Sequence, residues 1–531
     1  MREVEFWASQ LAKKRISRRE FMGRAAALGV SVGAANLLLA NRGMAEEGKK
    51  GGFARFGLPH GSTTDSIDPG TWPDTFGQCV FFGAMMNNLT EIDADGQVKG
   101  ELAESYEPDK GASRWVFKLR KGVTFHNGKD LTADDVLETI RYHAGADSKS
   151  AAKSLLAGIR QMTSDGPGVV VFDLVDPDAD FPFLMSDYHL PIFPARKGGG
   201  IDMEARSGTG PFVLEKFEPG VNAKLKRNPN YHKDGKPYFD EVEFLSLRDV
   251  SARMNALISG EVHYIANCDL KTLPQLETMD DLQILETTGY GHYTFAMNTK
   301  VAPFDNQDVR NALKYAIDRQ AIVDKVLYGH ATAGNDNPIA PGVKYAISPE
   351  PVHSYDPEKA KFHLKKAGLT SLKADLSVSN AAFEGAVDAA LLYQNSAKAA
   401  GIDINVVREP EDGYWDNVWM KKPWSAVYWS GRATCDWMLS TTYAEGASWN
   451  DTKWSNARFN ELLKTARGET DDKKRAEMYA EMQTLVHTDG GTIVLVFNNY
   501  VSALAKSLKH GKVAANWDDD GLKIAERWWF A

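Results

Sequence analysis

One short segment gathers side chains that could bind a small polar solute. Trp429 and Arg432 are followed within five residues by Thr434, Asp436 and Trp437. Indole rings exclude water from a cleft, and a few charged groups in such a setting fix the orientation of a polar ligand. We therefore expect at least one of these side chains to contact a ligand. The alternative is that both indoles are core packing and that Arg432 pairs with Asp436 at the surface.

Two other loops carry weaker candidates for ligand contact. Asp65, Trp72 and Gln78 follow the first predicted strand, and loops at strand ends commonly face the crevice of an α/β fold. Tyr414 and Trp415 follow a turn-forming run and could form a lid over the ligand. The alternatives are ordinary turn chemistry for the first loop and a cap on the domain for the second.

No catalytic or metal-binding pattern accompanies these candidates. The chain has no GxSxG, HExxH, Walker or dinucleotide glycine motif in a strand–turn–helix setting. Its 12 histidines are scattered, and its three cysteines, Cys79, Cys268 and Cys435, are far apart. We predict no metal site and no cofactor, and we expect three unpaired thiols, although one disulfide could form. These absences favour a binding protein over an enzyme.

The length and charge of the chain limit the number of domains and the kinds of binding partner that are possible. At 531 residues the chain is too long for one compact core, so two or more lobes are expected. Of the formal charge of −9, the first 45 residues contribute +5 and the remainder −14. An acidic body argues against nucleic acid or an anionic membrane as a partner. The 13 tryptophans suit a ligand cleft as well as a core.

Strand and helix patterns alternate along the chain without internal repeats. Residues 53–58 and 115–120 read as strands, the latter with the alternation of a half-buried one. Thr132 is a good N-cap for a helix, and residues 306–326 have the spacing of one long helix with a buried face. This alternation favours α/β lobes over an all-α or all-β structure.

The amino terminus has the marks of a twin-arginine export signal. Arg18 and Arg19 precede an apolar run over residues 25–40, and small residues follow up to Ala45. We expect cleavage after Ala45, transport of the folded protein by the twin-arginine translocase, and a periplasmic location. The alternative is an amphipathic or anchored N-terminal helix. No cysteine stands at the cut, so a lipid anchor is not indicated.

The ordered motifs of the mature chain resemble those of the extracellular solute-binding proteins of family 5, the peptide and nickel class. The hallmark passage occupies residues 102–106, 115–128 and 131–136, and supporting passages occupy residues 208–212, 227–231 and 306–319. Any one passage could be chance, whereas the ordered set is specific.

This resemblance implies an arrangement of domains. The family has two α/β lobes joined by paired hinge strands, with an additional domain inserted in the first lobe, which is the cluster C type of periplasmic binding protein. The hinge is expected near residues 293–299 and 498–500. Carried onto this chain, lobe I comprises residues 46–85, 205–295 and 500–531, the inserted subdomain 86–204, and lobe II 296–499.

The resemblance also implies a function. The protein is expected to be the substrate-binding component of an ABC importer, a monomer that captures a small molecule or short peptide between closing lobes and delivers it to membrane permease subunits. A nickel complex, haem, an opine or an oligosaccharide stays open as an alternative ligand, and a periplasmic hydrolase is the remote alternative. Tyr290 lies beside the expected hinge and could line the cleft, whereas His292 is more typical of a packed or solvated histidine.

The register of the tryptophan segment suggests the charge of the solute. Peptide-binding proteins that this stretch resembles place an aspartate three residues after the tryptophan, where it pairs with the amino terminus of the ligand. This chain has Arg432 at that spacing. A guanidinium would repel an ammonium group and could hold an anionic group as a two-pronged pair. We therefore expect an acidic peptide or an opine-like anion, with Asp436 still able to take an amine.

Overall fold

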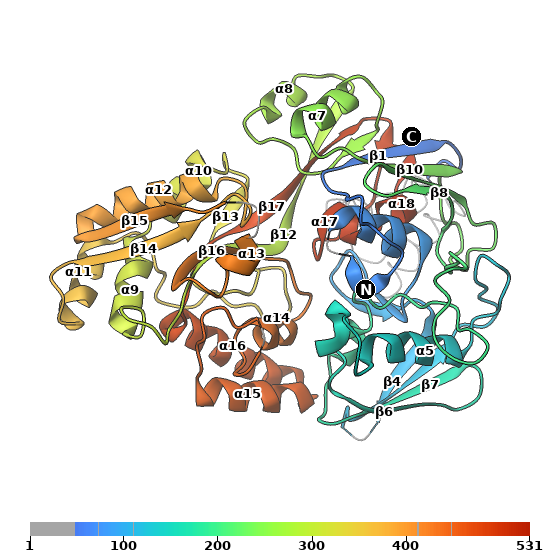
Figure 1. Ribbon diagram of the computed structural model, residues 1–531, viewed down its shortest axis with the longest axis horizontal. Coiled ribbons are helices and arrows are strands. Elements are labelled where there is room, and N and C mark those ends of the chain that lie inside the picture. The colour runs from blue at the N-terminus through green and yellow to red at the C-terminus, as the bar shows by residue number, and fades with distance from the viewer. Residues whose placement is uncertain (1–47, 73, 110, 411–413, 448) are drawn as a thin grey trace, which may run out of the picture.

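The computed structural model describes residues 48–72, 74–109, 111–410, 414–447 and 449–531. These residues form two bodies, and two long strands cross from one body to the other (Figure 1). The predicted twin-arginine leader and its cleavage point lie outside the described residues. Within the described ranges, no helix combines the length and apolar character needed to cross a bilayer.

One mixed sheet of 11 strands runs through both bodies. Strand β13 (Ala331–Ala333) pairs with β17 off the main path of this sheet. Along the path, the order is β15 (Ile402–Arg408), β14 (Leu372–Val378), β16 (Trp424–Trp429), β12 (Leu282–Met297), β17 (Thr492–Ala505), β11 (Tyr264–Ile265), β1 (Phe53–Leu58), β10 (Glu241–Ser246), β9 (Asn222–Arg227) and β8 (Phe212–Glu218).

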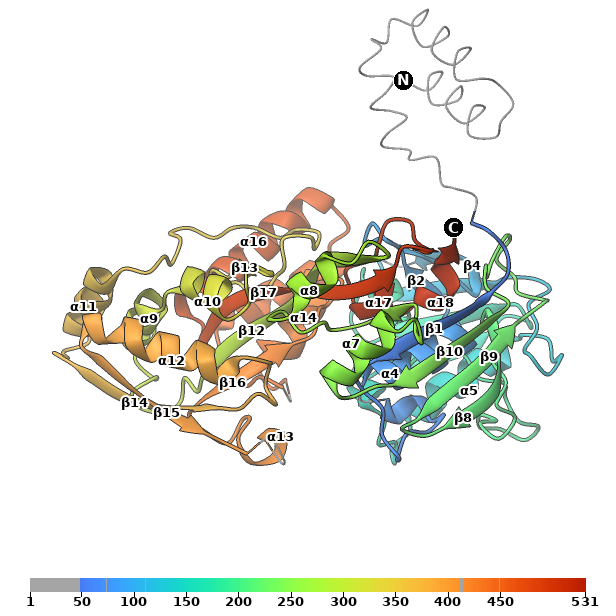
Figure 2. The same ribbon diagram turned by 90° about the horizontal axis from the view of Figure 1, so that it is seen from above.

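Strands β12 and β17 connect the two bodies, as both views show (Figures 1 and 2). The two strands are antiparallel partners along most of their length, and β12 also pairs with β16 from His292 onward. The ladder between β12 and β17 is interrupted between Thr288 and His292. This interruption lies just before residues 293–299 and opposite residues 498–500, the two segments where the sequence predicts the hinge.

The body that contains β1 and β8–β11 is called lobe I. It carries α7 (Val250–Ile258) and α8 (Leu273–Glu277) on one side of its sheet, and the last residues add α17 (Asp518–Gly521), α18 (Ile524–Arg527) and the short strand β19 (Trp529–Phe530). A separate antiparallel sheet of β4 (Ala103–Asp109), β5 (Arg114–Leu119), β7 (Val169–Leu174) and β6 (Ile159–Ser164) lies beside it with α5 (Ala133–Ala144). The boundaries that the sequence predicts for this inserted subdomain and for the lobes stay a prediction.

Helix α5 shows how the sequence specifies local structure in the inserted subdomain. Thr132 and Asp135 form a reciprocal capping box, and Asp134 adds a second carboxylate to the first turn. Acidic side chains there satisfy free N–H groups and favour the positive end of the helix dipole. The helix predicted to start after Thr132 is thus confirmed.

The other body, lobe II, packs helices around β12 and β14–β17. The single helix predicted over residues 306–326 is wrong, because the structure has two helices, α9 (Gln307–Ala316) and α10 (Arg319–Lys325). Ile317 is extended, and the Asp318 carboxylate accepts a hydrogen bond from the Ala321 N–H, which starts a new helix. The other helices used below are α12 (Ala386–Ala397), α14 (Cys435–Thr442), α15 (Ala457–Gly468) and α16 (Asp472–Asp489).

Each lobe has its own hydrophobic core. Phe56, Phe76 and Trp528 belong to the main core of lobe I, whereas Phe295 and Trp424 belong to that of lobe II. The three cysteines are buried within these layers and unpaired, which confirms the expectation of free thiols.

Candidate functional site between the lobes

Three segments meet where the lobes face one another: the loop after β16, the crossing of β12, and the segment before α17. The Tyr290 N–H on β12 donates to the Ala515 carbonyl at 3.2 Å. A side chain at position 431 would place its Cβ 2.6 Å from Tyr290 Cβ and 2.9 Å from the Asn516 carbonyl oxygen. Only glycine fits this contact, so the backbone of lobe II lies directly against lobe I at Gly431.

Arg432, next in the chain, has a guanidinium that is only partly satisfied. Its Nη1 donates to the backbone carbonyls of Ser430 at 3.1 Å and Gly431 at 3.0 Å, and its Cζ lies 5.5 Å from the centre of the Trp437 ring. Its Nε is buried without a hydrogen-bond partner, and no carboxylate of the described residues forms an ion pair with it. A buried donor without an acceptor is costly, and an anion is one group that could satisfy it.

The other polar members of the tryptophan segment are held by the protein itself. The Asp436 carboxylate accepts two hydrogen bonds from Arg467 Nε, at 2.9 and 3.1 Å, and is buried. The surface pair between Arg432 and Asp436 therefore does not form, and both Asp436 oxygens are already bonded to Arg467. The Thr434 hydroxyl caps α14 by accepting from the Trp437 N–H at 3.1 Å.

The two indoles of the segment divide between the lobes. Trp429 packs in a core of lobe II, with its ring 6.2 Å from Trp419 and 6.1 Å from Trp449. Trp437 stands on α14 of lobe II but packs into the main core of lobe I. Trp437 therefore contributes to the contact between the lobes, and it carries the Arg432 guanidinium over its face.

Asp518, at the start of α17, is the second charged group of this region, and α17 lies on the side of lobe I that faces lobe II (Figure 1). Burial and the Asp519 carboxylate raise the pKa of Asp518 to about 7. After burial, the Asp518 carboxylate is one of the charges that raise the pKa values of Tyr293, Tyr428 and Tyr500. Within the described ranges its side chain has no partner other than its own backbone N–H.

Arg432 and Asp518 shift the pKa values of the same two tyrosines, Tyr428 and Tyr500, in opposite directions. The guanidinium lowers the pKa values of Tyr428 and Tyr500, whereas the Asp518 carboxylate raises them. Tyr293 and Tyr428 are direct partners in the β12–β16 register, so their rings lie on one face of the sheet. We call Arg432, Asp518, Tyr293, Tyr428 and Tyr500 the inter-lobe site.

His292 is buried beside the inter-lobe site, next to Tyr293 on β12. It has no exposed surface, and neither ring nitrogen has a hydrogen-bond partner. Burial and the Arg432 charge lower its pKa to about 3, so the ring is neutral at physiological pH.

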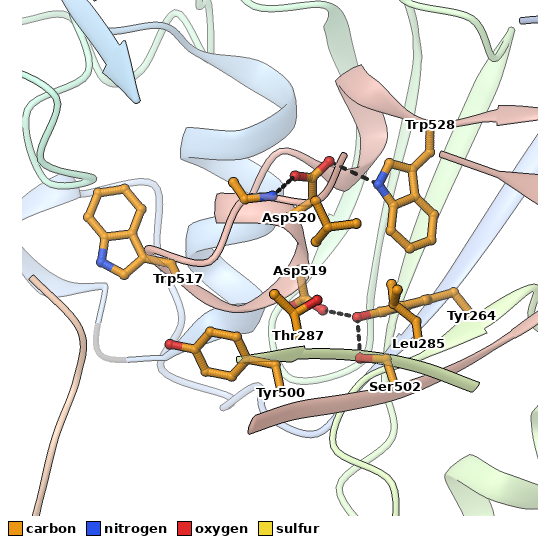
Figure 3. A pocket seen from close by; sticks show the side chains of 11 residues that line it. Tyr264, Leu285, Thr287, Tyr500, Ser502, Trp517, Asp519, Asp520 and Trp528 are labelled. Atoms are coloured by element: carbon orange, nitrogen blue, oxygen red, sulfur yellow. Dashed lines mark hydrogen bonds between the residues drawn. The ribbon is translucent and has the colours of Figure 1, made fainter. Parts of the chain in front are cut away.

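A small cavity lies behind the inter-lobe site, in lobe I (Figure 3). Its volume is about 10 Å³, which is the size of one water molecule and far too small for a peptide. Asp519 accepts from the Tyr264 hydroxyl at 2.5 Å, and Asp520 accepts from Trp528 Nε1 at 3.0 Å. These two carboxylates therefore hold lobe I together, unlike Asp518.

The remaining predicted site residues lie apart from Arg432 or at the edge of the gap. Trp72 stacks on Phe81 in the core of lobe I, Gln78 donates to the Trp72 carbonyl, and Asp65 accepts from the Ser62 N–H in a local turn. Tyr414 is buried in lobe II, where its hydroxyl donates to the Ala426 carbonyl. Trp415 is 37% exposed, and its ring lies 5.4 Å from that of Tyr428, so it borders the inter-lobe site.

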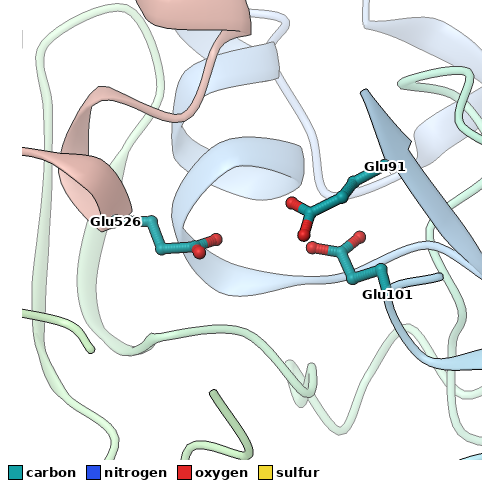
Figure 4. Close-up of side chains that lie close together, drawn as sticks. All are labelled: Glu91, Glu101 and Glu526. Atoms are coloured by element: carbon teal, nitrogen blue, oxygen red, sulfur yellow. The ribbon is translucent and has the colours of Figure 1, made fainter. Parts of the chain in front are cut away.

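Three carboxylates elsewhere in lobe I, those of Glu91, Glu101 and Glu526, lie close enough together to resemble a cation site (Figure 4). Lys233 Nζ lies 2.8, 2.8 and 3.0 Å from them, and Lys523 Nζ contacts Glu101 and lies 3.0 Å from Glu91. These two ammonium groups compensate two of the three negative charges, and a third, Lys236 Nζ, lies 3.4 Å from Glu526, so this donor set does not fit a metal ion. We call the three glutamates together with Lys233 and Lys523 the buried ion cluster.

Sequence reasoning missed Asp518 and all three tyrosines of the inter-lobe site as candidate site residues, although Tyr293 and Tyr500 lie in the predicted hinge segments. Residues 518–520 are three consecutive aspartates, and nothing in that run distinguishes the one that faces the other lobe. Tyr428 precedes Trp429 by one residue, so the alternation of side chains along a strand could have placed it on the opposite face.

Comparison with known proteins agrees with this geometry. The chain is 27% identical over 477 residues to the oligopeptide-binding protein AppA of Bacillus subtilis, covering 83% of this chain and 86% of AppA. It is 27% identical over 465 residues to the glutathione-binding protein GsiB of Salmonella typhimurium, covering 84% and 90%. The structure of AgaA from A. tumefaciens R10 in complex with agropinic acid superposes with a TM-score of 0.76 at 23% identity, over 90% of this chain and 99% of AgaA.

These likenesses show the fold as a mixed α/β periplasmic binding protein fold, as the sequence predicts. They also agree with the expectation that the protein binds a solute and is not an enzyme. The model of the bacterial extracellular solute-binding proteins, family 5 (middle region), matches residues 97–451, about two thirds of the chain. This protein therefore belongs to the bacterial extracellular solute-binding proteins of family 5.

Proposed function

We propose that this protein is the periplasmic solute-binding component of an ABC importer, and that it closes around a peptide-like solute whose anionic group binds Arg432. In this proposal the twin-arginine translocase exports the protein, which acts as a monomer and hands its closed form to membrane permease subunits. Lobe I comprises residues 46–85, 205–295 and 500–531, the inserted subdomain 86–204 and lobe II 296–499.

The observation that carries the proposal is the Arg432 guanidinium itself. It lies where the lobes meet, it has a buried Nε without an acceptor, and its ring contact with Trp437 keeps it in place. A carboxylate would satisfy Nε and a terminal nitrogen together, which is the two-pronged geometry that arginine prefers.

Two classes of solute fit this charge. GsiB is named for glutathione and AppA for oligopeptides, and both classes of compound carry carboxylates. AgaA was solved with agropinic acid, so an opine-like acid is the second candidate. An oligosaccharide would leave the guanidinium without an anion and is disfavoured by the same observation.

The test is a binding panel of glutathione, agropinic acid, an oligosaccharide, and short peptides prepared as free acids and as C-terminal amides. A solute that binds only the folded protein raises its melting temperature, and titration calorimetry then gives its affinity. We expect Arg432→Met to weaken binding of the acidic members by about 10- to 100-fold, because a charge-assisted pair is lost.

The matched control is Arg408→Met, which removes an exposed guanidinium at the end of β15. It should bind the acidic members as tightly as the wild type does. Equal affinity of the Arg432→Met variant and the wild type, or binding of the oligosaccharide alone, would contradict the proposed function.

A further inference from the structure

The inserted subdomain touches lobe II beyond α14, away from the strands that join the lobes. The Ala179 N–H, in the loop after β7, donates to the Arg467 carbonyl at the end of α15 at 2.8 Å. Arg475 Nη2, near the start of α16, donates to the Asp180 carboxylate at 2.8 Å. Figure 1 shows α15, α16 and the inserted subdomain on the side of the molecule away from α7 and α8. We call residues 176–180 and residues 467–475 the clasp.

Each half of the clasp is held in place by its own body. The Asp178 carbonyl accepts a hydrogen bond from Trp115 Nε1 on β5 at 2.9 Å, which fixes the loop on the inserted subdomain. Arg475 Nε donates to the Ala466 carbonyl at 3.2 Å, and its Cζ lies 5.5 Å from the centre of the Tyr479 ring. Two surfaces that are already ordered lose little conformational entropy when they meet, so the clasp favours the closed form.

The clasp brings backbone against backbone. Besides the hydrogen bond from Ala179 to Arg467, a side chain at position 468 would place its Cβ 3.0 Å from Pro177 Cβ. A direct hydrogen bond between main chains leaves no space for other atoms between them. A bound solute therefore cannot pass between the two halves of the clasp while it is formed.

The clasp also lies close to Arg432 along the chain. The Asp436 carboxylate, in the first turn of α14, bonds to Arg467 of the clasp, and Trp437 packs into the core of lobe I. Gly431 touches lobe I on the other side of Arg432. Contacts between the bodies thus flank Arg432 from residue 431 to residue 437, and six residue steps span at most about 20 Å even in extended chain.

We propose that the clasp limits the solute to a short compound, no longer than a peptide of about five residues, which spans roughly 17 Å when extended. This inference rests on the proposed function and specifies the size of its ligand. A nonapeptide reaches roughly 30 Å, so one anchored on Arg432 would extend past the flanking contacts and hold residues 176–180 away from α15. The closed form would then lose the hydrogen bonds of the clasp, and long solutes would bind weakly.

The experiment uses acidic peptides of two, three, five, seven and nine residues, prepared as free acids, and measures their affinity by titration calorimetry. The proteins are the wild type, Asp180→Asn and the matched control Asp176→Asn, whose side chain faces Lys464 at 3.9 Å with both groups exposed. We expect the wild type and the control to bind the best peptide of five residues or fewer at least about tenfold more tightly than the nonapeptide.

The Asp180→Asn variant should reduce this length preference. It should bind the short peptides about 3- to 10-fold more weakly than the wild type does, because the closed form loses a charged hydrogen bond. It should bind the peptides of seven and nine residues within about twofold of the wild type, because these peptides already keep the clasp open. A long peptide that binds too weakly to measure meets the expected limit.

The outcomes separate the two proposals. Equal affinity of the wild type for five- and nine-residue peptides, or an equal loss for short and long peptides in Asp180→Asn, would show that the clasp does not limit length. The proposed function would stand in either case if binding still depended on Arg432. If no acidic compound depends on Arg432, the proposed function itself fails.

Discussion

The buried ion cluster and the inter-lobe site both contain carboxylates and basic side chains. These groups are paired with one another in the cluster and unpaired in the inter-lobe site. In the cluster, Glu101 and Lys523 are almost fully buried and every carboxylate contacts an ammonium group. In the inter-lobe site, Arg432 and Asp518 belong to different lobes, and neither forms an ion pair with any described residue, although the Arg432 charge helps to lower the pKa of Asp187.

The electrostatics of the two regions differ accordingly. Burial alone would raise the pKa of Glu526, but the ammonium groups of Lys233, Lys236 and Lys523 hold it at about 2. Burial raises the pKa of Asp518 to about 7, and no cation opposes it. Removing one partner of a buried pair leaves an uncompensated charge inside that lobe, whereas an unpaired charge between lobes could pair with a bound solute.

The largest effect is expected from breaking the buried ion cluster. Lys523→Met leaves Glu101 and Glu91 with one ammonium group fewer, and uncompensated buried charge typically costs about 3–5 kcal/mol of unfolding free energy. Urea unfolding measures this loss. The exposed Lys216→Met variant should change the unfolding free energy by less than about 0.5 kcal/mol. A similarly small change for Lys523→Met would show that the cluster does not stabilise lobe I.

An intermediate effect is expected from a pair that joins the inserted subdomain to lobe II. Arg475 Nη2 on α16 donates to Asp180 at 2.8 Å, and nearby the Ala179 N–H donates to the Arg467 carbonyl. Asp180→Asn should weaken binding of the tightest panel compound by about 3- to 10-fold, because the closed form loses a charged hydrogen bond.

Calorimetry measures that change, and Asp176→Asn is its control. Asp176 faces Lys464 across the same boundary, but at 3.9 Å and with both side chains exposed, so its removal should leave affinity within about twofold. Equal effects of the two variants would mean that closure does not depend on the Arg475 contact.

The smallest change in stability is expected from the inter-lobe site itself. In solute-free protein, Arg432→Met and Asp518→Asn should keep or raise the unfolding free energy, because neither removes an ion pair. The folded pKa of Asp518 is raised above the unfolded value, so the unfolded state releases its proton first and wild-type stability falls as pH rises from about 4 to 7.

The Asp518→Asn variant lacks this dependence, so its advantage over the wild type should grow between pH 4 and pH 8. Urea unfolding at several pH values measures the difference. A loss of stability as large as that of Lys523→Met would place Asp518 among the structural charges and remove the contrast between the two regions.

Secondary-structure elements could be predicted from the sequence where a few neighbouring residues specify them. Strand β5 and the helix after Thr132 could be predicted because alternation and a capping box are encoded within a few residues. The break between α9 and α10 was missed, although Asp318 is a good N-cap, because the apolar spacing continues across it.

The site could be predicted only in part, since proximity in sequence does not decide pairing. Arg432 and Asp436 are one turn apart in the chain, yet the Thr434 cap directs Asp436 toward Arg467 and leaves Arg432 between the lobes. The role of Asp518 depends on contacts that its neighbours Asp519 and Asp520 make with distant residues, which no local pattern records.

The most direct test of the account is a crystal structure of the protein with the panel compound that binds most tightly. The account predicts a compound enclosed between the lobes, with an acid oxygen about 2.7–2.9 Å from the Arg432 guanidinium. A compound bound outside the gap, or one enclosed there while Arg432 still bonds only to the carbonyls of Ser430 and Gly431, would contradict it.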